Sequence, residues 1–121
     1  MRIPQEHCGA LAQGVAAFSL EVVTIILLYR HNTVLLVVLC LEALVALRVW
    51  SRRDDRVAFL LTGLVGSLAE AAFVRAGVWR YANPSLLGLP IWFPVSFGLA
   101  GVAAQRLVRS LLACWEQQRL S

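Results

Sequence analysis

Four long apolar runs, each ending in a short polar stretch, constrain this chain more than any other feature. They lie at residues 10–29, 34–50, 57–79 and 90–112. A helix needs about 20 apolar residues to cross a hydrocarbon core of about 30 Å, and the second run is at the lower edge of that range. Backbone groups in lipid must be paired within a helix or a closed barrel, and no strand-like alternation is present. We therefore predict an all-α membrane protein, with residues 1–121 as a single transmembrane domain whose four helices form an antiparallel bundle.

Composition agrees with a membrane protein. Hydrophobic residues make up 60% of the 121 residues and charged residues 15%, whereas soluble domains are about 45–50% apolar. A soluble chain of this length could not bury so much apolar surface. The first apolar run is longer than the core of a signal peptide, which spans about 7–15 residues, so we interpret it as a helix of the mature protein.

The basic residues, all of which are Arg, predict the orientation. With four spans, the N-terminus, the second connection and the C-terminus share one side of the membrane. That side carries eight Arg residues, against three on the other. The first group is Arg2, Arg48, Arg52, Arg53, Arg56, Arg106, Arg109 and Arg119, and the second is Arg30, Arg75 and Arg80. The positive-inside rule then predicts a bacterial inner-membrane protein with both termini in the cytoplasm (N-in/C-in).

The Trp residues fit the same orientation. Trp50 and Trp115 are expected at the inner interface, and Trp79 and Trp92 at the outer one. The net charge of +4 could suggest a nucleic-acid partner, but the Arg residues lie between apolar runs and form no basic face. We expect no nucleic acid and take membrane lipids as the partners.

Glu21, Glu42 and Glu70 are unusual because each lies inside an apolar run. A charged group at the centre of a membrane helix costs about 2.5–3.5 kcal/mol on insertion scales. We therefore expect these carboxyls to be protonated, hydrogen-bonded or turned toward a shared polar interior. They are candidate catalytic groups for acid–base chemistry, and the alternative is that they only hold helices together as hydrogen-bond donors.

Small and polar residues recur at helical spacing and favour a shared interior. Such stripes allow helices to approach closely in lipid. They consist of Gly14, Ala17, Glu21 and Thr24 in the first run, Gly63, Gly66, Ser67 and Glu70 in the third, and Pro94, Gly98, Gly101 and Gln105 in the fourth. We expect Pro94 to free a backbone carbonyl inside the membrane, which marks a cavity or needs another partner.

A second group of candidate residues surrounds the predicted loop at 80–88. Arg and aromatic side chains here are partly explained by the membrane interface, but together they could also form a mouth for a polar-headed lipid. The candidate substrate-binding residues are Arg75, Trp79, Arg80, Tyr81, Asn83, Trp92 and Gln105.

Metal and cofactor motifs are not apparent in the sequence. Cys8, Cys40 and Cys114 match no zinc or redox spacing, and an odd number at separate depths argues against a disulfide framework. His7 and His31 have no partners at metal-ligand spacing. We predict no metal and no cofactor.

Residues 63–101 resemble a segment of the carotenoid-biosynthesis membrane family, which includes carotenoid hydratases and lycopene-cyclase-type domains. The resemblance lies in Gly66-x-x-x-Glu70, then Gly77-Val-Trp-Arg-Tyr81, Asn83-Pro84 and the stretch from Gly88 to Pro94. Where lycopene cyclases have Pro-x-Glu-Glu, this chain has Pro90-Ile-Trp-Phe93. The resemblance implies that Glu70 is an acid that protonates an isoprenoid double bond, and that residues 77–94 shape its pocket.

Three functions remain open on sequence alone. The first is acid–base modification of a lipid or isoprenoid by the membrane carboxyls. The second is a small proton-coupled transporter, which would act as a homo-oligomer because four short helices enclose little volume. The third is a non-catalytic membrane subunit or assembly factor whose polar stripes contact a partner helix.

Overall fold

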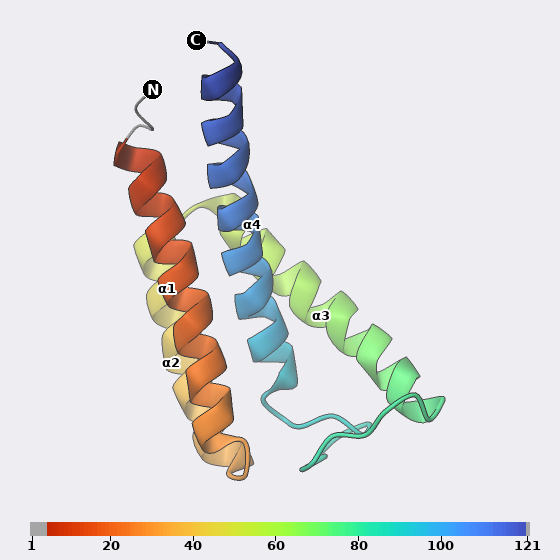
Figure 1. The fold of residues 1–121 in the computed structure, drawn as a ribbon. Coiled ribbons are helices and arrows are strands. Elements are labelled where there is room, and N and C mark those ends of the chain that lie inside the picture. The colour runs from red at the N-terminus through yellow and green to blue at the C-terminus, as the bar shows by residue number, and fades with distance from the viewer. Residues whose placement is uncertain (1–4, 121) are drawn as a thin grey trace.

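The computed structural model describes residues 5–120, with side chains described from Gly9 onward. It consists of α1 (Gln5–Leu28), α2 (Asn32–Trp50), α3 (Arg53–Arg75) and α4 (Phe93–Arg119) (Figure 1). All four helices in this range are long and apolar enough to cross a membrane, which confirms the predicted all-α class. Arg2 and the side chains of His7 and Cys8 lie outside the described residues.

Both ends of α3 differ from the predicted ones for clear physical reasons. α3 begins at Arg53 rather than at residue 57, because Asp54 and Asp55 in its first turn favour a helix N-terminus. It ends at Arg75 rather than at residue 79, since Gly77 turns the chain with a φ of 81°.

The start of α4 corrects the expectation for Pro94. This residue lies in the first turn of the helix, where a backbone N–H would be unpaired in any case. It therefore starts the helix and does not break it. At the other end α4 continues to Arg119, well past the predicted limit of residue 112. With 27 residues, α4 is about 40 Å long, which exceeds the hydrocarbon thickness of about 30 Å.

α4 is the central helix of the molecule. Its most extensive contacts are with α3 and then with α1, and it also contacts α2. Within the described residues α1 and α3 do not contact each other, and α3 diverges from α2 along its length (Figure 1). The beginning of α1 and the end of α4 lie at one end of the molecule, and the α3–α4 loop lies at the other.

Glycines allow α3 and α4 to approach each other closely. A Cβ at Gly63 would lie 2.9 Å from the Pro94 carbonyl oxygen, and one at Gly98 would lie 2.7 Å from the Phe59 carbonyl oxygen. On α1, a Cβ at Gly14 would lie 3.1 Å from the Leu107 side chain. The predicted small-residue stripes are therefore helix contacts, but they meet α4 from two sides and do not surround one cavity.

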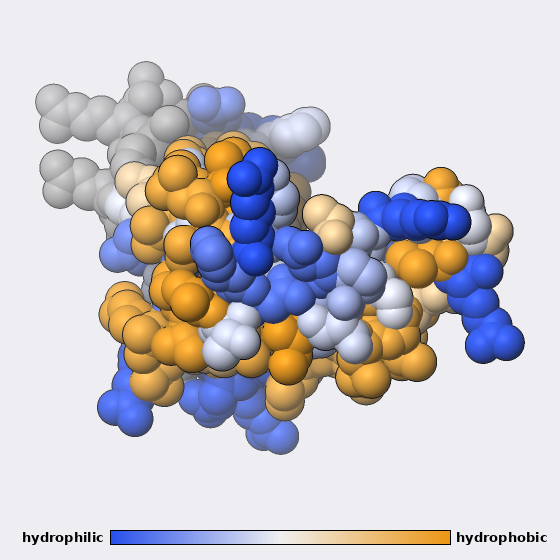
Figure 2. Space-filling model, turned by 90° about the horizontal axis from the view of Figure 1, so that it is seen from below, coloured by the Kyte–Doolittle hydropathy of each residue, from blue (hydrophilic) through white to orange (hydrophobic). Residues whose placement is uncertain are grey.

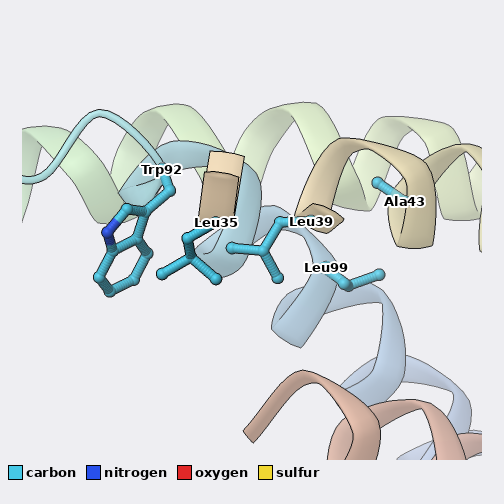
Figure 3. Packing of buried hydrophobic residues seen from close by; sticks show 5 residues of the cluster. All are labelled: Leu35, Leu39, Ala43, Trp92 and Leu99. Atoms are coloured by element: carbon cyan, nitrogen blue, oxygen red, sulfur yellow. The ribbon is translucent and has the colours of Figure 1, made fainter. Parts of the chain in front are cut away.

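A compact cluster joins α2 to α4 at the centre of the molecule. It consists of Leu35, Leu39, Ala43, Trp92 and Leu99, all at most 8% exposed (Figure 3). Outside this cluster the helices present many large apolar side chains. Figure 2, a view onto the end with the α3–α4 loop, shows hydrophobic side chains over much of the surface, with hydrophilic ones in the middle of this end and at its margins.

Hydrogen bonds attach the α3–α4 loop to the α1–α2 turn. Asn32 Nδ2 donates to the Asn83 carbonyl (2.8 Å) and to Ser85 Oγ (2.9 Å), while Asn83 Nδ2 donates to the Tyr29 carbonyl (2.8 Å). The Trp92 indole donates to Asn32 Oδ1 at 3.2 Å. Trp92, which was expected at the outer interface, is buried at the start of α4, where its indole N–H has this partner.

Candidate functional site

Glu21 is buried where α1 meets α4. Its side chain is 3% exposed, and Ser96 Oγ donates to Glu21 Oε1 at 2.8 Å. The second oxygen, Oε2, is buried and has no hydrogen-bond partner among the described residues. Nearly all buried polar groups in proteins have a partner, so an unpaired carboxyl oxygen here needs an explanation.

Glu42 on α2 faces the same region, and its carboxyl group has fewer hydrogen-bond partners than that of Glu21. Both of its carboxyl oxygens are buried, and neither has a hydrogen-bond partner in the described range of the chain. It lies close enough to Glu21 for their charges to interact, and Thr24 faces it from α1. The Thr24 hydroxyl donates its hydrogen to the Leu20 carbonyl at 2.8 Å. The structure thus brings two of the three predicted carboxyls together, from two different helices.

An apolar groove of about 470 Å³ runs between α1 and α2 beside this pair. Its walls include Ala17 and Leu20 from α1 and Val38 and Val45 from α2, and Glu42 is the one ionisable side chain in its lining. Pockets for small apolar ligands have volumes of about 300–1,000 Å³ and few polar groups. The groove therefore has the size and lining expected for a hydrocarbon chain.

Trp50 and Gln13 lie at one end of the groove and are joined by a hydrogen bond. The indole Nε1 of Trp50 donates to Gln13 Oε1 at 3.1 Å. Trp50, which was expected at the inner interface, is only 7% exposed. Each of these residues is eight positions along its helix from a carboxyl, Trp50 from Glu42 and Gln13 from Glu21. At 1.5 Å per residue the polar end of the groove is therefore about 12 Å from the carboxyl pair.

Glu70 forms a separate group with two residues of the α3–α4 loop. Its Oε2 accepts hydrogen bonds from Trp79 Nε1 (2.9 Å) and from the Tyr81 hydroxyl (2.7 Å). Because α1 and α3 make no contact in the described chain, Glu70 does not belong to the Glu21–Glu42 pair. Burial, and then the hydrogen bond to Glu70, raise the pKa of Tyr81 to about 12. The Tyr81 ring packs edge-on against Phe93 with centroids 5.5 Å apart, so this group anchors the loop to both α3 and α4.

The other predicted binding residues lie in different places. Arg75 lines a groove of about 440 Å³ together with Leu87 of the α3–α4 loop, and Arg80 is exposed. Asn83 is used in the hydrogen bonds that hold the loop, and Gln105 lines a groove between α3 and α4 at the opposite end of the molecule. The structure therefore does not assemble them into a single mouth.

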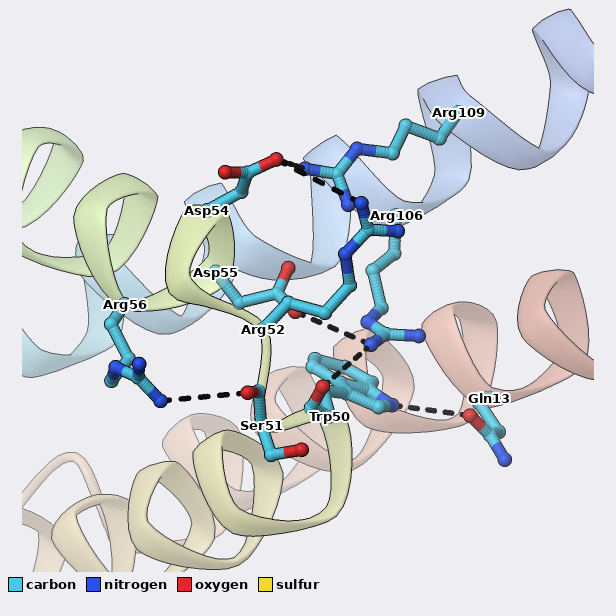
Figure 4. A network of polar contacts seen from close by, with 9 residues as sticks. All are labelled: Gln13, Trp50, Ser51, Arg52, Asp54, Asp55, Arg56, Arg106 and Arg109. Carbon is cyan, nitrogen blue, oxygen red and sulfur yellow. Dashed lines mark hydrogen bonds and ion pairs between the residues drawn. The ribbon is translucent and has the colours of Figure 1, made fainter.

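A charged cluster at the α2–α3 connection was missed by sequence reasoning. Asp55 is fully buried, and Arg106 Nη2 lies 3.3 Å from its Oδ2 (Figure 4). The Arg106 guanidinium also stacks on the Trp50 ring, 4.3 Å from the centroid, and reaches the Trp50 carbonyl at 3.4 Å. The segment was interpreted as a polar turn. The available signal was the acidic pair in this segment, because negative side chains are favoured in the first turn of a helix.

Comparisons of the chain with family models, with curated proteins and with solved structures find no match. The resemblance to carotenoid-biosynthesis proteins therefore stands on residues 63–101 alone. The function of the chain must be inferred from its own geometry.

The chemistry available at the Glu21–Glu42 pair is proton exchange. Within residues 9–120, no group of three or more His, Cys, Asp or Glu side chains could hold a metal ion. Two carboxyls in different environments can separate acid and base roles, since one is hydrogen-bonded to Ser96 and the other is unpaired. The adjoining groove provides the apolar binding surface that a substrate of such a pair would need.

Proposed function

We propose that this chain is a membrane enzyme that binds a lipid or isoprenoid in the α1–α2 groove and exchanges a proton with it through Glu42 and Glu21. One observation carries the proposal. The carboxyl oxygens of Glu42 are buried without a hydrogen-bond partner in the described chain, in the wall of an apolar groove. Polar groups inside membranes are expensive and mark functional positions.

A purely structural role accounts poorly for this arrangement. A Glu that holds helices together should donate or accept a hydrogen bond across the interface, as Glu21 of α1 does with Ser96 of α4. The Thr24 hydroxyl lies beside Glu42 but donates its hydrogen to the Leu20 carbonyl, so neither carboxylate oxygen of Glu42 receives a hydrogen bond from the described residues, although Glu42 costs about as much to place in the membrane. Its position is therefore better explained by a bound molecule.

The reaction that suits this pair without a co-reactant is movement of a carbon–carbon double bond. The Glu42 carboxylic acid gives its proton to one alkene carbon, and the π electrons form the new C–H bond. The resulting cation loses a proton from the neighbouring carbon, and that C–H electron pair becomes the new double bond. Glu21 or Glu42 accepts this proton, so the enzyme ends with the protons that it had at the start.

Deuterium uptake tests the proposal without knowledge of the substrate. Membranes containing the protein are incubated in D₂O, and the extracted lipids are compared by mass spectrometry with those from membranes lacking it. We expect a lipid species that gains carbon-bound deuterium only with the protein present. Because the proton donor acts in the chemical step, Glu42→Gln should reduce the uptake by at least about 100-fold, the usual contribution of general acid catalysis.

Glu70→Gln is the matched control. It changes another membrane carboxyl in the same way, but it lies outside the groove, so deuterium uptake should persist. Equal loss in Glu42→Gln and Glu70→Gln, or no uptake with the wild-type protein, would refute acid–base chemistry at this pair. Retention of the helical circular dichroism spectrum shows that a variant still folds.

Proton-coupled transport is the second candidate, because carboxyls buried between helices can also carry protons. It predicts substrate flux into proteoliposomes that depends on a pH gradient and that Glu42→Gln abolishes, together with dimers in mild detergent. The apolar lining of the groove favours a lipid substrate over a small polar one. Co-purification with a larger membrane protein would support a subunit role instead.

We also propose that the four helices cross the bacterial inner membrane in an antiparallel arrangement with both termini in the cytoplasm. The Arg distribution supports this orientation. The beginning of α1 and the end of α4 lie on the same end of the molecule, which is consistent with it. Labelling of Arg52→Cys by a membrane-impermeant reagent from outside intact cells would contradict the assignment.

A further inference from the structure

A second groove lies between α3 and α4, at the end opposite the α3–α4 loop. Its volume is about 380 Å³, and its lining changes character along its length. The polar section consists of Arg53, Asp54, Gln105 and Arg109. Val57 and Leu61, which lie about one and two turns beyond Arg53 on α3, form an apolar section. A groove with charge at one end and hydrocarbon at the other matches an amphiphile.

The charges around the polar section leave an excess of cations. Arg109 Nη2 pairs with Asp54 Oδ2 at 3.1 Å, and Arg52 approaches the same oxygen at 3.9 Å (Figure 4). Arg53 is exposed and has no hydrogen-bond or ion-pair partner among the described residues. Two guanidinium groups therefore approach the single carboxylate of the groove, Asp54, and a third cation, Arg53, lines the same groove. The local field favours an additional anion.

We propose that this groove binds a phospholipid with a net negative headgroup. The phosphate lies between Arg53 and Arg109, whose planar N–H groups suit phosphate oxygens. One acyl chain lies along Val57 and Leu61. Basic pockets between membrane helices are known to bind anionic headgroups in this way. The apolar section of the groove selects a lipid rather than free phosphate, and the excess positive charge selects an anionic lipid over a zwitterionic one.

The test is lipid retention by the purified full chain. The protein is equilibrated in mixed micelles containing equal amounts of phosphatidylglycerol and phosphatidylcholine, and bound lipid is counted by native mass spectrometry. The wild-type protein should retain phosphatidylglycerol selectively. Since a hydrogen bond to a charged group contributes about 1.5–3 kcal/mol, Arg53→Gln and Arg109→Gln should each lower its affinity at least about tenfold.

Arg48→Gln is the matched control, because Arg48 is an exposed Arg in the last turn of α2, at the same end of the molecule but outside the groove. It should leave retention nearly unchanged. An equal loss in Arg48→Gln would mean a general surface potential rather than a site, and would overturn the proposal.

Two further variants test the charge and the shape of the groove separately, and the first predicts a gain that misfolding cannot imitate. Asp54→Asn removes the carboxylate that competes for Arg109, so it should strengthen phosphatidylglycerol retention. Val57→Trp should weaken retention with no change of charge, because it fills the apolar section. Displacement of the lipid by glycerol phosphate at similar concentration, or weaker retention in Asp54→Asn, would contradict a lipid site of this design.

Discussion

The replacement Gly98→Ala tests the closest approach of a described glycine to the backbone of a neighbouring helix. Its new Cβ would lie 2.7 Å from the Phe59 carbonyl oxygen and 3.0 Å from the Phe59 ring, whereas ordinary contact begins at 3.4 Å. The carbonyl belongs to the backbone of α3 and cannot rotate away. α3 and α4 must therefore separate by about 0.7 Å, the shortfall from ordinary contact, along the whole seam that Gly63 and Gly98 share.

Overpacking of this kind costs about 1–3 kcal/mol. Alanine also stabilises a helix by about 1 kcal/mol relative to glycine, which would hide some of the loss of stability. Gly9→Ala removes this ambiguity, because Gly9 lies in α1 with nothing within 4 Å of its Cβ position. The gain in helix propensity is the same in both variants. The difference between their free energies of unfolding therefore measures the cost of the overpacked contact.

The free energy of unfolding is measured by titration with sodium dodecyl sulfate in mixed micelles, followed by circular dichroism. We expect Gly98→Ala to be less stable than Gly9→Ala by about 1–3 kcal/mol. Equal stability of the two variants would show that α3 and α4 do not meet at this distance, and would refute the central position of α4.

Two further changes test the ends of the molecule. In Tyr81, burial and then the hydrogen bond to Glu70 raise the pKa from 10.0 to about 12, so its contribution to stability is complete below pH 10 and is lost as the pH rises through 12. Phenolate absorbance during an alkaline titration, compared with Tyr81→Phe, measures this shift, and titration near pH 10 would contradict the bond to Glu70. Asp55→Asn should destabilise the protein by about 3–5 kcal/mol in the same detergent titration, since it leaves Arg106 without its buried counter-charge. Asp54→Asn should cost less than about 1 kcal/mol because the Asp54 side chain is 63% exposed, and similar losses in these two Asp variants would contradict the burial of Asp55.

The apolar runs carried enough information to predict four helices and their approximate positions. Length and hydropathy alone decide whether a segment can cross a membrane, and neither depends on tertiary contacts. The glycine stripes also identified real helix contacts, because close approach in lipid requires small residues. Helix ends were less predictable: α3 and α4 begin three or four residues away from the apolar limits, where Asp54 and Pro94 set the first turns.

The grouping of polar residues could not be predicted, because it depends on how the helices are arranged. Periodicity placed Glu21 and Glu70 on the inner stripes of their helices, but it could not show that α4 separates α1 from α3. The same limit applies to Asn32, which was treated as a polar turn residue. It receives a hydrogen bond from Trp92, 60 positions along the chain.

Three nearby positions on α4 each engage a different neighbour. Ser96 bonds to Glu21 of α1, Gly98 abuts Phe59 of α3, and Leu99 packs with Leu35 and Leu39 of α2. A rotation of α4 about its axis, or a translation along it, must therefore disturb its contacts with α1, α2 and α3 together. A displacement of α1 would therefore reach α3 through α4, although within the described residues α1 and α3 do not contact each other.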